Sequence, residues 1–565
     1  MGTPHQRRLS SAFPVALAVA VVAVPVAAGL TGTLLPAFGI LPALGGDRFS
    51  LTPWATLLAQ PGLAVSVRLT VVAGFAATAL SLVAVAAFCA VFHATRWFRA
   101  AQALTAPVLA SPHVAIAIGL LALTSPSGLL VRLVSPWATG WRTPPDFATV
   151  NDSWGVSLVI GLALKETAYL LLMTAAALNQ IPAARLMAVA RSLGQPPAVA
   201  WLKTIFPAIY AQIRLPVLAV LAYALSAVDV ALLLGPGSPP PLAVLVVRWF
   251  FDPDLSRIFP AAAAACLLLG ITAASMVVWV ALERIAGRLG RRWAASGAMR
   301  GEALAGVTAR MLPVVIGMAL ASLFVAAVWS LAGPWRFPDA WPARIDTATW
   351  SAQAHGLAGP LRTTLLAALA ATTLALPIAV TALEAVARHG ARARPALLRL
   401  IYLPLLVPQT AFLFGTQVAL LALGLDGGWP ALIWAHLVFV LPYVLLSLNR
   451  PYAALDPRLA QTAASLGAGP WRVLWAVKLP ILLRPLLAAF AVGVAVSAGQ
   501  YLATLFAGGG RMSTLATEAV TLASGGDRRV LGVFAVVQAG VPFAFYALAM
   551  LLPSLVWRRR AGLRP

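Results

Sequence analysis

Charged residues are scarce in this chain. Only 10% of its 565 residues are Asp, Glu, Lys or Arg, whereas 61% are hydrophobic. A soluble globular protein carries roughly 25% charged and 45–50% apolar residues. Too few polar side chains remain to cover so much apolar surface in water, so a soluble fold is excluded. The composition predicts that lipid surrounds most of the chain.

Cysteine is also rare, and the two cysteines, Cys89 and Cys266, lie inside apolar runs. We expect both to be small buried hydrophobic side chains. The 6 histidines are scattered without the spacing of a metal site. The chain has no GxxxxGK[ST] loop to hold nucleotide phosphates. The sequence therefore predicts no metal, no cofactor and no ATP site within this chain.

Acidic residues are few, 16 against 40 Lys and Arg, and the formal net charge is +24. A basic soluble protein would suggest a nucleic-acid partner. Here the positive charges form short clusters between apolar blocks, which is typical of topology signals in membrane proteins. We therefore exclude nucleic acid and expect the lipid bilayer as the partner of these segments.

Apolar runs of about 20 residues or more, the length that crosses ~30 Å of hydrocarbon as a helix, recur along the chain. They predict an all-α, polytopic membrane protein with about twelve transmembrane helices. The first run follows Arg7 and Arg8 and could be a signal peptide, but it continues past any cleavage site near Ala27 and Ala28. The predicted helices are 13–35, 64–92, 102–123, 154–178, 212–235, 258–282, 311–333, 359–386, 400–423, 430–448, 482–506 and 530–555.

Lys and Arg concentrate in alternate connections, and this asymmetry predicts the orientation. With a cytoplasmic amino terminus, most basic residues fall inside the cell, and the carboxyl terminus is also cytoplasmic. The expected location is a bacterial inner membrane. Tryptophans crowd the connections expected outside, as interfacial aromatic residues do. They are Trp137, Trp141, Trp335, Trp341 and Trp350.

The connection after the fourth predicted helix is repeated after the tenth. Residues 184–207, the first loop, read ARLMAVARSLGQPPAVAWLKTIFP, and residues 457–480, the second loop, read PRLAQTAASLGAGPWRVLWAVKLP. Each contains Ser-Leu-Gly and ends in a proline at the same distance from that glycine. Such self-similarity indicates two homologous units. We predict a cytoplasmic amino terminus (1–12), a first half (13–282), a basic linker (283–310), a second half (311–555) and a basic tail (556–565).

Weaker echoes support this division. The stretch 67–70, which reads VRLT, resembles the stretch 361–364, which reads LRTT, and Pro112 resembles Pro408.

The repeated loop has a readable design. About seven small and apolar residues before the glycine can form a short helix, and the glycine permits a turn that other residues resist. A short amphipathic stretch follows, in which we expect Trp201 or Trp471 and Trp475 to face apolar neighbours. The closing proline suits the first turn of the next spanning helix. An ordinary basic loop is the alternative, and identical spacing in two copies disfavours it.

These loops resemble the EAA motif of binding-protein-dependent ABC importer permeases, in which Glu-Ala-Ala precedes a glycine turn and an Ile/Leu-x-Leu-Pro ending. The resemblance covers both halves, so the chain resembles two fused permease domains of the MetI-like type, as in ferric-iron and thiamine importers. It implies that each loop is a coupling helix that docks on an ATPase subunit. The residues carried over are Ala188, Ser192, Leu193, Gly194 and Pro207, with Gln461, Ser465, Leu466, Gly467 and Pro480.

The chain departs from that pattern at one position. The family glutamate, six residues before the glycine, is replaced by Ala188 in the first loop and by Gln461 in the second. Neither side chain can form the ion pair that the glutamate makes with the ATPase. Docking must then depend on shape and on polar contacts.

Several polar residues lie inside predicted spans, where a charge costs ~2.5–3.5 kcal/mol at the bilayer centre. Lys165 and Glu166 are adjacent on one helix and point about 100° apart, so each needs a partner elsewhere. They could form ion pairs between helices, line a transport path, or indicate a misplaced helix boundary.

A second polar group recurs in both halves. Ser226 and Asp229 lie in a stretch that matches Ser497 and Gln500. These four, with Gln409 and Gln417 in the ninth predicted helix, either line the path or make hydrogen bonds between helices.

The sequence thus predicts a permease subunit of an ATP-driven importer that is not itself an enzyme. Its expected partners are two copies of an ATPase subunit and a soluble solute-binding protein, working by alternating access. One alternative is a secondary transporter of twelve helices, since the stretch 287–292, GRLGRR, faintly resembles the basic loop of that class. Another is a membrane enzyme, but no catalytic cluster is visible. The substrate stays open among iron, thiamine, a polyamine, an oxyanion or another solute.

Overall fold

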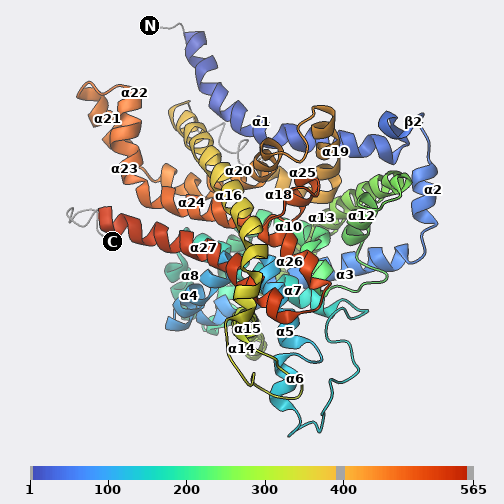
Figure 1. Ribbon diagram of the computed structural model, residues 1–565. Helices are drawn as coiled ribbons and strands as arrows, with labels where there is room; N and C mark the ends of the chain where they lie inside the picture. Colours follow the sequence, from blue (N-terminus) through green and yellow to red (C-terminus); the bar gives the residue numbers. More distant parts are fainter. Residues whose placement is uncertain (1–3, 390–400, 557–565) are drawn as a thin grey trace.

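The structure is a computed structural model that describes residues 4–389 and 401–556 (Figure 1). Within these ranges nearly every element is a helix, and strands β1 (Ile40–Leu41) and β2 (Gly46–Asp47) form only a short antiparallel ribbon. Helices satisfy their backbone hydrogen bonds internally, as a chain in hydrocarbon requires. The predicted all-α polytopic fold is confirmed. Nearly all of the predicted tail and the first residue of predicted helix 400–423 lie outside the described residues.

The helices form two successive series. Those of the first half are α1 (Pro4–Ala37), α2 (Thr52–Leu58), α3 (Leu63–Phe92), α4 (Arg96–Ala110), α5 (His113–Thr124), α6 (Leu129–Val134), α7 (Val156–Leu178), α8 (Ala183–Ser192), α9 (Pro197–Thr204), α10 (Phe206–Ser226), α11 (Asp229–Leu234), α12 (Leu242–Phe250) and α13 (Ile258–Ala295).

After α14 (Glu302–Thr308), the second half follows. Its helices are α15 (Met311–Leu331), α16 (Ala348–His389), α18 (Leu403–Leu406), α19 (Gln409–Ala422), α20 (Trp429–Ala453), α21 (Pro457–Ser465), α22 (Pro470–Val473), the π-helical turn η3 (Leu474–Lys478), α23 (Leu479–Ile481), α24 (Leu483–Ala498), α25 (Leu502–Gly508), α26 (Leu515–Ala523) and α27 (Arg528–Val556).

The number of unbroken spans is smaller than predicted. Of the described residues, ten helices are long and apolar enough to cross a bilayer, or eleven if one bent pair counts as a span. The sequence predicted twelve. Predicted helices 102–123, 212–235, 400–423 and 482–506 are each interrupted. The first two still contain a segment long enough to span, His113–Val134 and Phe206–Ser226, so the difference comes from 400–423, where only the short helix Gln409–Ala422 remains, and from 482–506, which lies in the bent pair. Apolar composition continues across each interruption, so hydropathy alone does not reveal it.

The first interruption precedes Pro112 in the first half and Pro408 in the second. Proline has no N–H and disfavours helical backbone in the residue before it. Helix α4 therefore ends and α5 begins around Pro112, and α18 and α19 meet in the same way at Pro408. The second interruption separates α10 from α11 and α24 from α25. Each half is thus broken at the same two places.

A shared hydrogen bond gives the weaker sequence echo a structural meaning. The hydroxyl of Thr70 on α3 accepts from the backbone N–H of Leu242, at the start of α12 (2.9 Å). The hydroxyl of Thr364 on α16 accepts from the N–H of Leu515, at the start of α26 (2.9 Å). Threonines at corresponding positions therefore cap corresponding helices in the two halves.

The first helix of each half packs on the other half. Helix α1 lies along α19, and α15 lies along α5 (Figure 1). Both crossings need a glycine: a Cβ at Gly415 would lie 2.0 Å from the carbonyl oxygen of Gly29, and one at Gly119 would lie 2.1 Å from that of Ser322. Close crossings at small residues are typical of membrane helices. The two halves are therefore interlocked.

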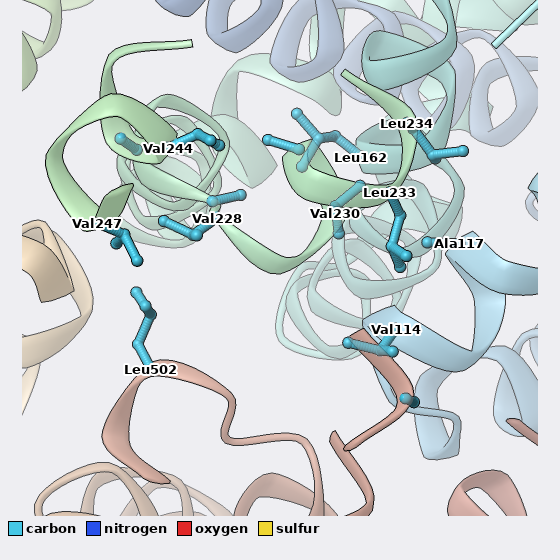
Figure 2. Packing of buried hydrophobic residues seen from close by; sticks show 14 of the residues in the cluster. Val114, Ala117, Leu162, Val228, Val230, Leu233, Leu234, Val244, Val247 and Leu502 are labelled. Carbon is cyan, nitrogen blue, oxygen red and sulfur yellow. The ribbon is translucent and has the colours of Figure 1, made fainter. Parts of the chain in front are cut away.

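One core joins the halves at their centre. Figure 2 shows Val114, Leu162, Val230 and Val247 of the first half in this cluster, with Leu502 of α25 beside Val247. The interrupted helices α5, α11 and α25 all contribute to it. Their short pieces are held by packing on several sides.

Arg132 on α6 fastens the connection between α15 and α16 to the first half. Its buried guanidinium lies over the rings of Trp329 and Trp335 and donates to the carbonyls of Arg336 (2.7 Å) and Asp339 (3.1 Å). Ring contacts and charge-assisted hydrogen bonds both favour the guanidinium here.

Candidate coupling loops and translocation path

The glycines of the two loops adopt the same backbone conformation. Gly194 has φ of 74° and Gly467 has φ of 82°, in the left-handed region that favours glycine. Each glycine follows a short helix, α8 or α21, and closes it with the same two hydrogen bonds. In the first loop the backbone N–H of Gly194 donates to the carbonyl of Arg191 (3.0 Å), and that of Gln195 to the carbonyl of Ala190 (3.2 Å). In the second loop the N–H of Gly467 donates to the carbonyl of Ala464 (3.0 Å), and that of Ala468 to the carbonyl of Ala463 (3.0 Å).

The tip of each loop presents an apolar side chain. Leu193 is 70% exposed and Leu466 is 82% exposed. The rest of the chain therefore leaves a leucine side chain uncovered at both tips. Four other predicted docking residues are exposed on the same short helices. They are Ala188 and Ser192 on α8, and Gln461 and Ser465 on α21.

The stretch after the glycine differs between the loops. Trp201 is fully buried, as predicted. The prediction is wrong for Trp471 and Trp475, which are both exposed. In the second loop Leu474 occupies the position that aligns with Trp201, and it is buried instead.

The closing prolines also differ. Pro207 lies in the first turn of α10, as predicted. Pro480 lies in the first turn of α23, a helix of 3 residues, and the chain bends by 77° before α24. The expectation that Pro480 would open the spanning helix itself is therefore wrong.

An ion cluster anchors the second loop. The carboxylate of Glu384 on α16 accepts two hydrogen bonds from Nζ of Lys478 (2.8 and 2.8 Å) and one from Nε of Arg388 (2.6 Å). The hydroxyl of Tyr452 on α20 also donates to it. The loop's second part is therefore tied to two spanning helices.

The first loop has no such ion pair at these positions. Aligning Thr70 with Thr364 places Ala90 at the position of Glu384, and aligning Gly194 with Gly467 places Ile205 at that of Lys478. Ala90 and Ile205 are buried in one apolar cluster.

Polar groups gather at the interruption between α4 and α5. Lys165 on α7 donates from Nζ to the carbonyl of Ser111 (2.7 Å), which the break leaves without a helical partner. Glu166 hydrogen-bonds with His113, the first residue of α5 (3.3 Å). Each of the two adjacent charges therefore has its partner on another element, as expected. The helix boundary is not misplaced, because both lie well inside α7.

The same group extends to the second interruption. The ring of His113 contacts that of Tyr223 on α10, with centroids 4.6 Å apart. The hydroxyl of Tyr223 donates to Asp229 at the start of α11 (3.5 Å). Ser226, the last residue of α10, bonds back to the carbonyl of Ala222 (2.8 Å) and stabilises the helix end.

In the second half, His436 on α20 bridges the break between α24 and α25. Its ring hydrogen-bonds with the hydroxyls of Ser497 (2.7 Å) and Thr504 (3.0 Å). Gln500 lies within that break, and Gln409 and Gln417 are partly buried on α19.

The two halves approach each other at these breaks. A Cβ at Gly499 would lie 3.8 Å from Cβ of Pro112, so an interruption of one half adjoins an interruption of the other.

Sequence reasoning missed His113, Tyr223 and His436. A signal existed for one of them. Pro112 and Pro408 echo each other, and each is followed by a polar residue, His113 or Gln409. Gln409 was singled out, so His113 could have been found by the same alignment.

The chain is similar to known ABC transporter permeases, and one of these relatives matches almost its whole length. It is 34% identical over 533 residues to the inner membrane ABC transporter permease protein YnjC of Escherichia coli (strain K12), covering 93% of this chain and 94% of that protein. It is 28% identical over 209 residues to the putative 2-aminoethylphosphonate transport system permease protein PhnV of Salmonella typhimurium, covering 36% of this chain and 77% of that protein.

A third relative is the molybdenum transport system permease protein ModB of Haemophilus influenzae. It is 27% identical over 143 residues, covering 23% of this chain and 62% of that protein. No family model matches the chain.

Proposed function

This chain belongs to the ABC transporter permeases, and we propose that its first and second loops are the sites at which two ATPase subunits dock and drive it. It is the permease subunit of an importer, and the relative that it matches over 93% of its length, YnjC, is an inner membrane permease. The observation that carries the docking proposal is the repeated turn. Two loops far apart in sequence end a short helix with the same hydrogen bonds and expose a leucine at the tip.

Both loops would face the cytoplasm, with both chain termini on that side. Two observations support this orientation. Lys and Arg concentrate in the connections that include the loops. In Figure 1, α8 lies on the same side of the molecule as α21 and α22, and α27 ends on that side, opposite α2 and β2.

The translocation path would run between the halves, where their interrupted helices meet. Broken helices at matching positions of two repeats are typical of transporter binding sites, because free backbone groups and polar side chains meet there. The path residues in this proposal are Lys165, Glu166, Ser226, Asp229, Gln409, Ser497 and Gln500, together with His113 and Tyr223.

Closure of two docked ATPase subunits would move both loops together and rock the halves about this centre. The interlocked helices α1 and α15 would keep the halves joined during that motion. A solute-binding protein would deliver the substrate at the opposite face. The relatives are named for the transport of different solutes, so we assign substrate choice to that protein.

Tryptophan at both loop glycines tests the docking proposal. Gly194→Trp with Gly467→Trp forces a bulky side chain onto a left-handed backbone at each tip. We expect the variant to insert in the membrane and to lose co-purification with its ABC ATPase subunit. Gly140→Trp is the matched control, because Gly140 has φ of 72° and open space around it, in a connection predicted outside. Unchanged ATPase binding by the double variant would refute the docking role.

A further inference from the structure

The segment between the halves lies against the first loop. Helix α13 runs on to Ala295, well beyond the predicted span end at 282, and a turn then leads to α14. Glu283 on α13 fastens the start of this segment, since its carboxylate accepts from Nε of Arg214 (2.7 Å) and from the hydroxyl of Tyr210 (2.7 Å) on α10. The start of the predicted linker 283–310 is therefore fixed to α10 of the first half.

Glu302, the first residue of α14, caps the second helix of the first loop. Its carboxylate accepts from the backbone N–H of Ala198 (3.2 and 3.0 Å) and of Val199 (3.2 Å), at the start of α9. These N–H groups have no partner within their own helix, and a carboxylate also complements the positive end of the helix dipole. The interaction joins residues more than a hundred positions apart in the chain.

Two further contacts hold the same place. Lys203 near the end of α9 donates from Nζ to the carbonyl of Ala298 (2.5 Å). Its ammonium also lies 4.8 Å from the ring centroid of Trp293 on α13, within the range of a cation–π contact. The linker therefore contacts α9 at both ends of that helix.

Met299 brings the linker to the docking turn itself. A Cβ built on Gly194 would lie 3.7 Å from Cε of Met299, a van der Waals distance, so the end of the Met299 side chain lies next to the turn. Met299 is exposed, as is Leu193, the residue that precedes Gly194. The chain itself covers neither side chain, and methionine adapts well to a protein interface.

The second loop lacks this arrangement within the part of the chain that the structure describes. No described atom lies within 4 Å of a Cβ built on Gly467. That loop is held by the cluster around Glu384 instead. The two loops share a turn but not a support.

We propose that the linker stretch 298–302 forms part of the first ATPase-docking surface. In this arrangement, Glu302 is a positioning residue that fixes α9, and Met299 adds an apolar contact beside Leu193 and Gly194. The inference rests on the proposed function of the loops. The two docking sites are then unequal, and the linker supports only the first.

Cross-linking to the ABC ATPase subunit tests this surface. Single cysteines replace Leu193, Leu466 or Met299 in a full-length chain carrying Cys89→Ala and Cys266→Ala, co-expressed with its ATPase. Leu425→Cys is the control, as an exposed leucine in a connection predicted outside. We expect cross-links from positions 193, 466 and 299 and none from 425. Cross-links from 193 and 466 without one from 299 would overturn the Met299 contact and leave the loops' role intact. No cross-link from 193 or 466 would overturn both proposals.

Variants of Glu302 test the positioning role. Glu302→Ala removes charge-assisted hydrogen bonds to two N–H groups, so we expect the cross-link from position 193 to fall about tenfold while that from 466 is unchanged. Glu302→Gln keeps an acceptor oxygen and should recover part of the loss. An equal fall at both positions would indicate general unfolding and overturn the proposal, as would no fall at 193.

Discussion

Replacing Glu384 by alanine should destabilise the protein and loosen the second loop. The carboxylate is 8% exposed, and Lys478, which makes two hydrogen bonds to it, is 15% exposed. Loss of the carboxylate leaves the ammonium of Lys478 largely buried without an opposite charge. Breaking a buried ion pair in this way costs about 3–5 kcal/mol. Arg388 is 39% exposed, so its share is small, about 0.5 kcal/mol. We therefore expect a loss of about 3 kcal/mol.

The first half suggests how the loss can be reversed. There the aligned positions hold Ala90 and Ile205, a buried apolar pair. Replacing a buried ion pair by apolar residues is often neutral, whereas removing one partner is not. The double variant Glu384→Ala with Lys478→Ile should therefore be more stable than Glu384→Ala alone, despite carrying one more substitution.

Thermal unfolding in detergent, followed for the wild type, both single variants and the double variant, measures this coupling. We expect a coupling energy of about 2 kcal/mol, within the range for residues in direct contact. Additive losses, with the double variant the least stable of all, would refute the claim that these two side chains act as one anchor.

Three further outcomes are expected. Gly415→Val should reduce the yield of folded protein by size-exclusion chromatography, because its Cβ would lie 2.0 Å from Gly29 oxygen, whereas Gly317→Val, with open space around it, should not. Arg132→Met should lower the thermal unfolding midpoint through a loss of about 2 kcal/mol, since the four carbonyls to which its guanidinium donates lose a charged donor; the exposed Arg142→Met should leave it unchanged. His113→Ala should slow binding-protein-stimulated ATP hydrolysis about tenfold while the ATPase subunit stays bound. The control His355→Ala, at an exposed position, should leave the rate of hydrolysis unchanged.

The sequence predicted the fold class and the repeat because both follow from composition and spacing. Lipid requires long apolar helices, and the repeat is read from two copies of Ser-Leu-Gly at equal distance from a closing proline. The turn at Gly194 and Gly467 was also predictable, since only glycine suits that backbone.

Other features depend on tertiary contacts that no local pattern contains. Hydropathy does not show that α1 packs on α19, because it does not distinguish a helix face that contacts another helix from one that contacts lipid. The second interruption, between α10 and α11, contains no proline to announce it. The cap that Glu302 provides for α9 joins distant residues, so helix-capping rules that consider neighbours could not find it.

The ratio of ATPase subunits to this chain tests the central claim most directly. Native mass spectrometry of the detergent-solubilised complex should give two ATPase subunits for each chain. It should give one when Gly467→Trp alone blocks the second loop. A single ATPase subunit on the wild-type chain, or two retained with both loop glycines replaced by tryptophan, would contradict the account.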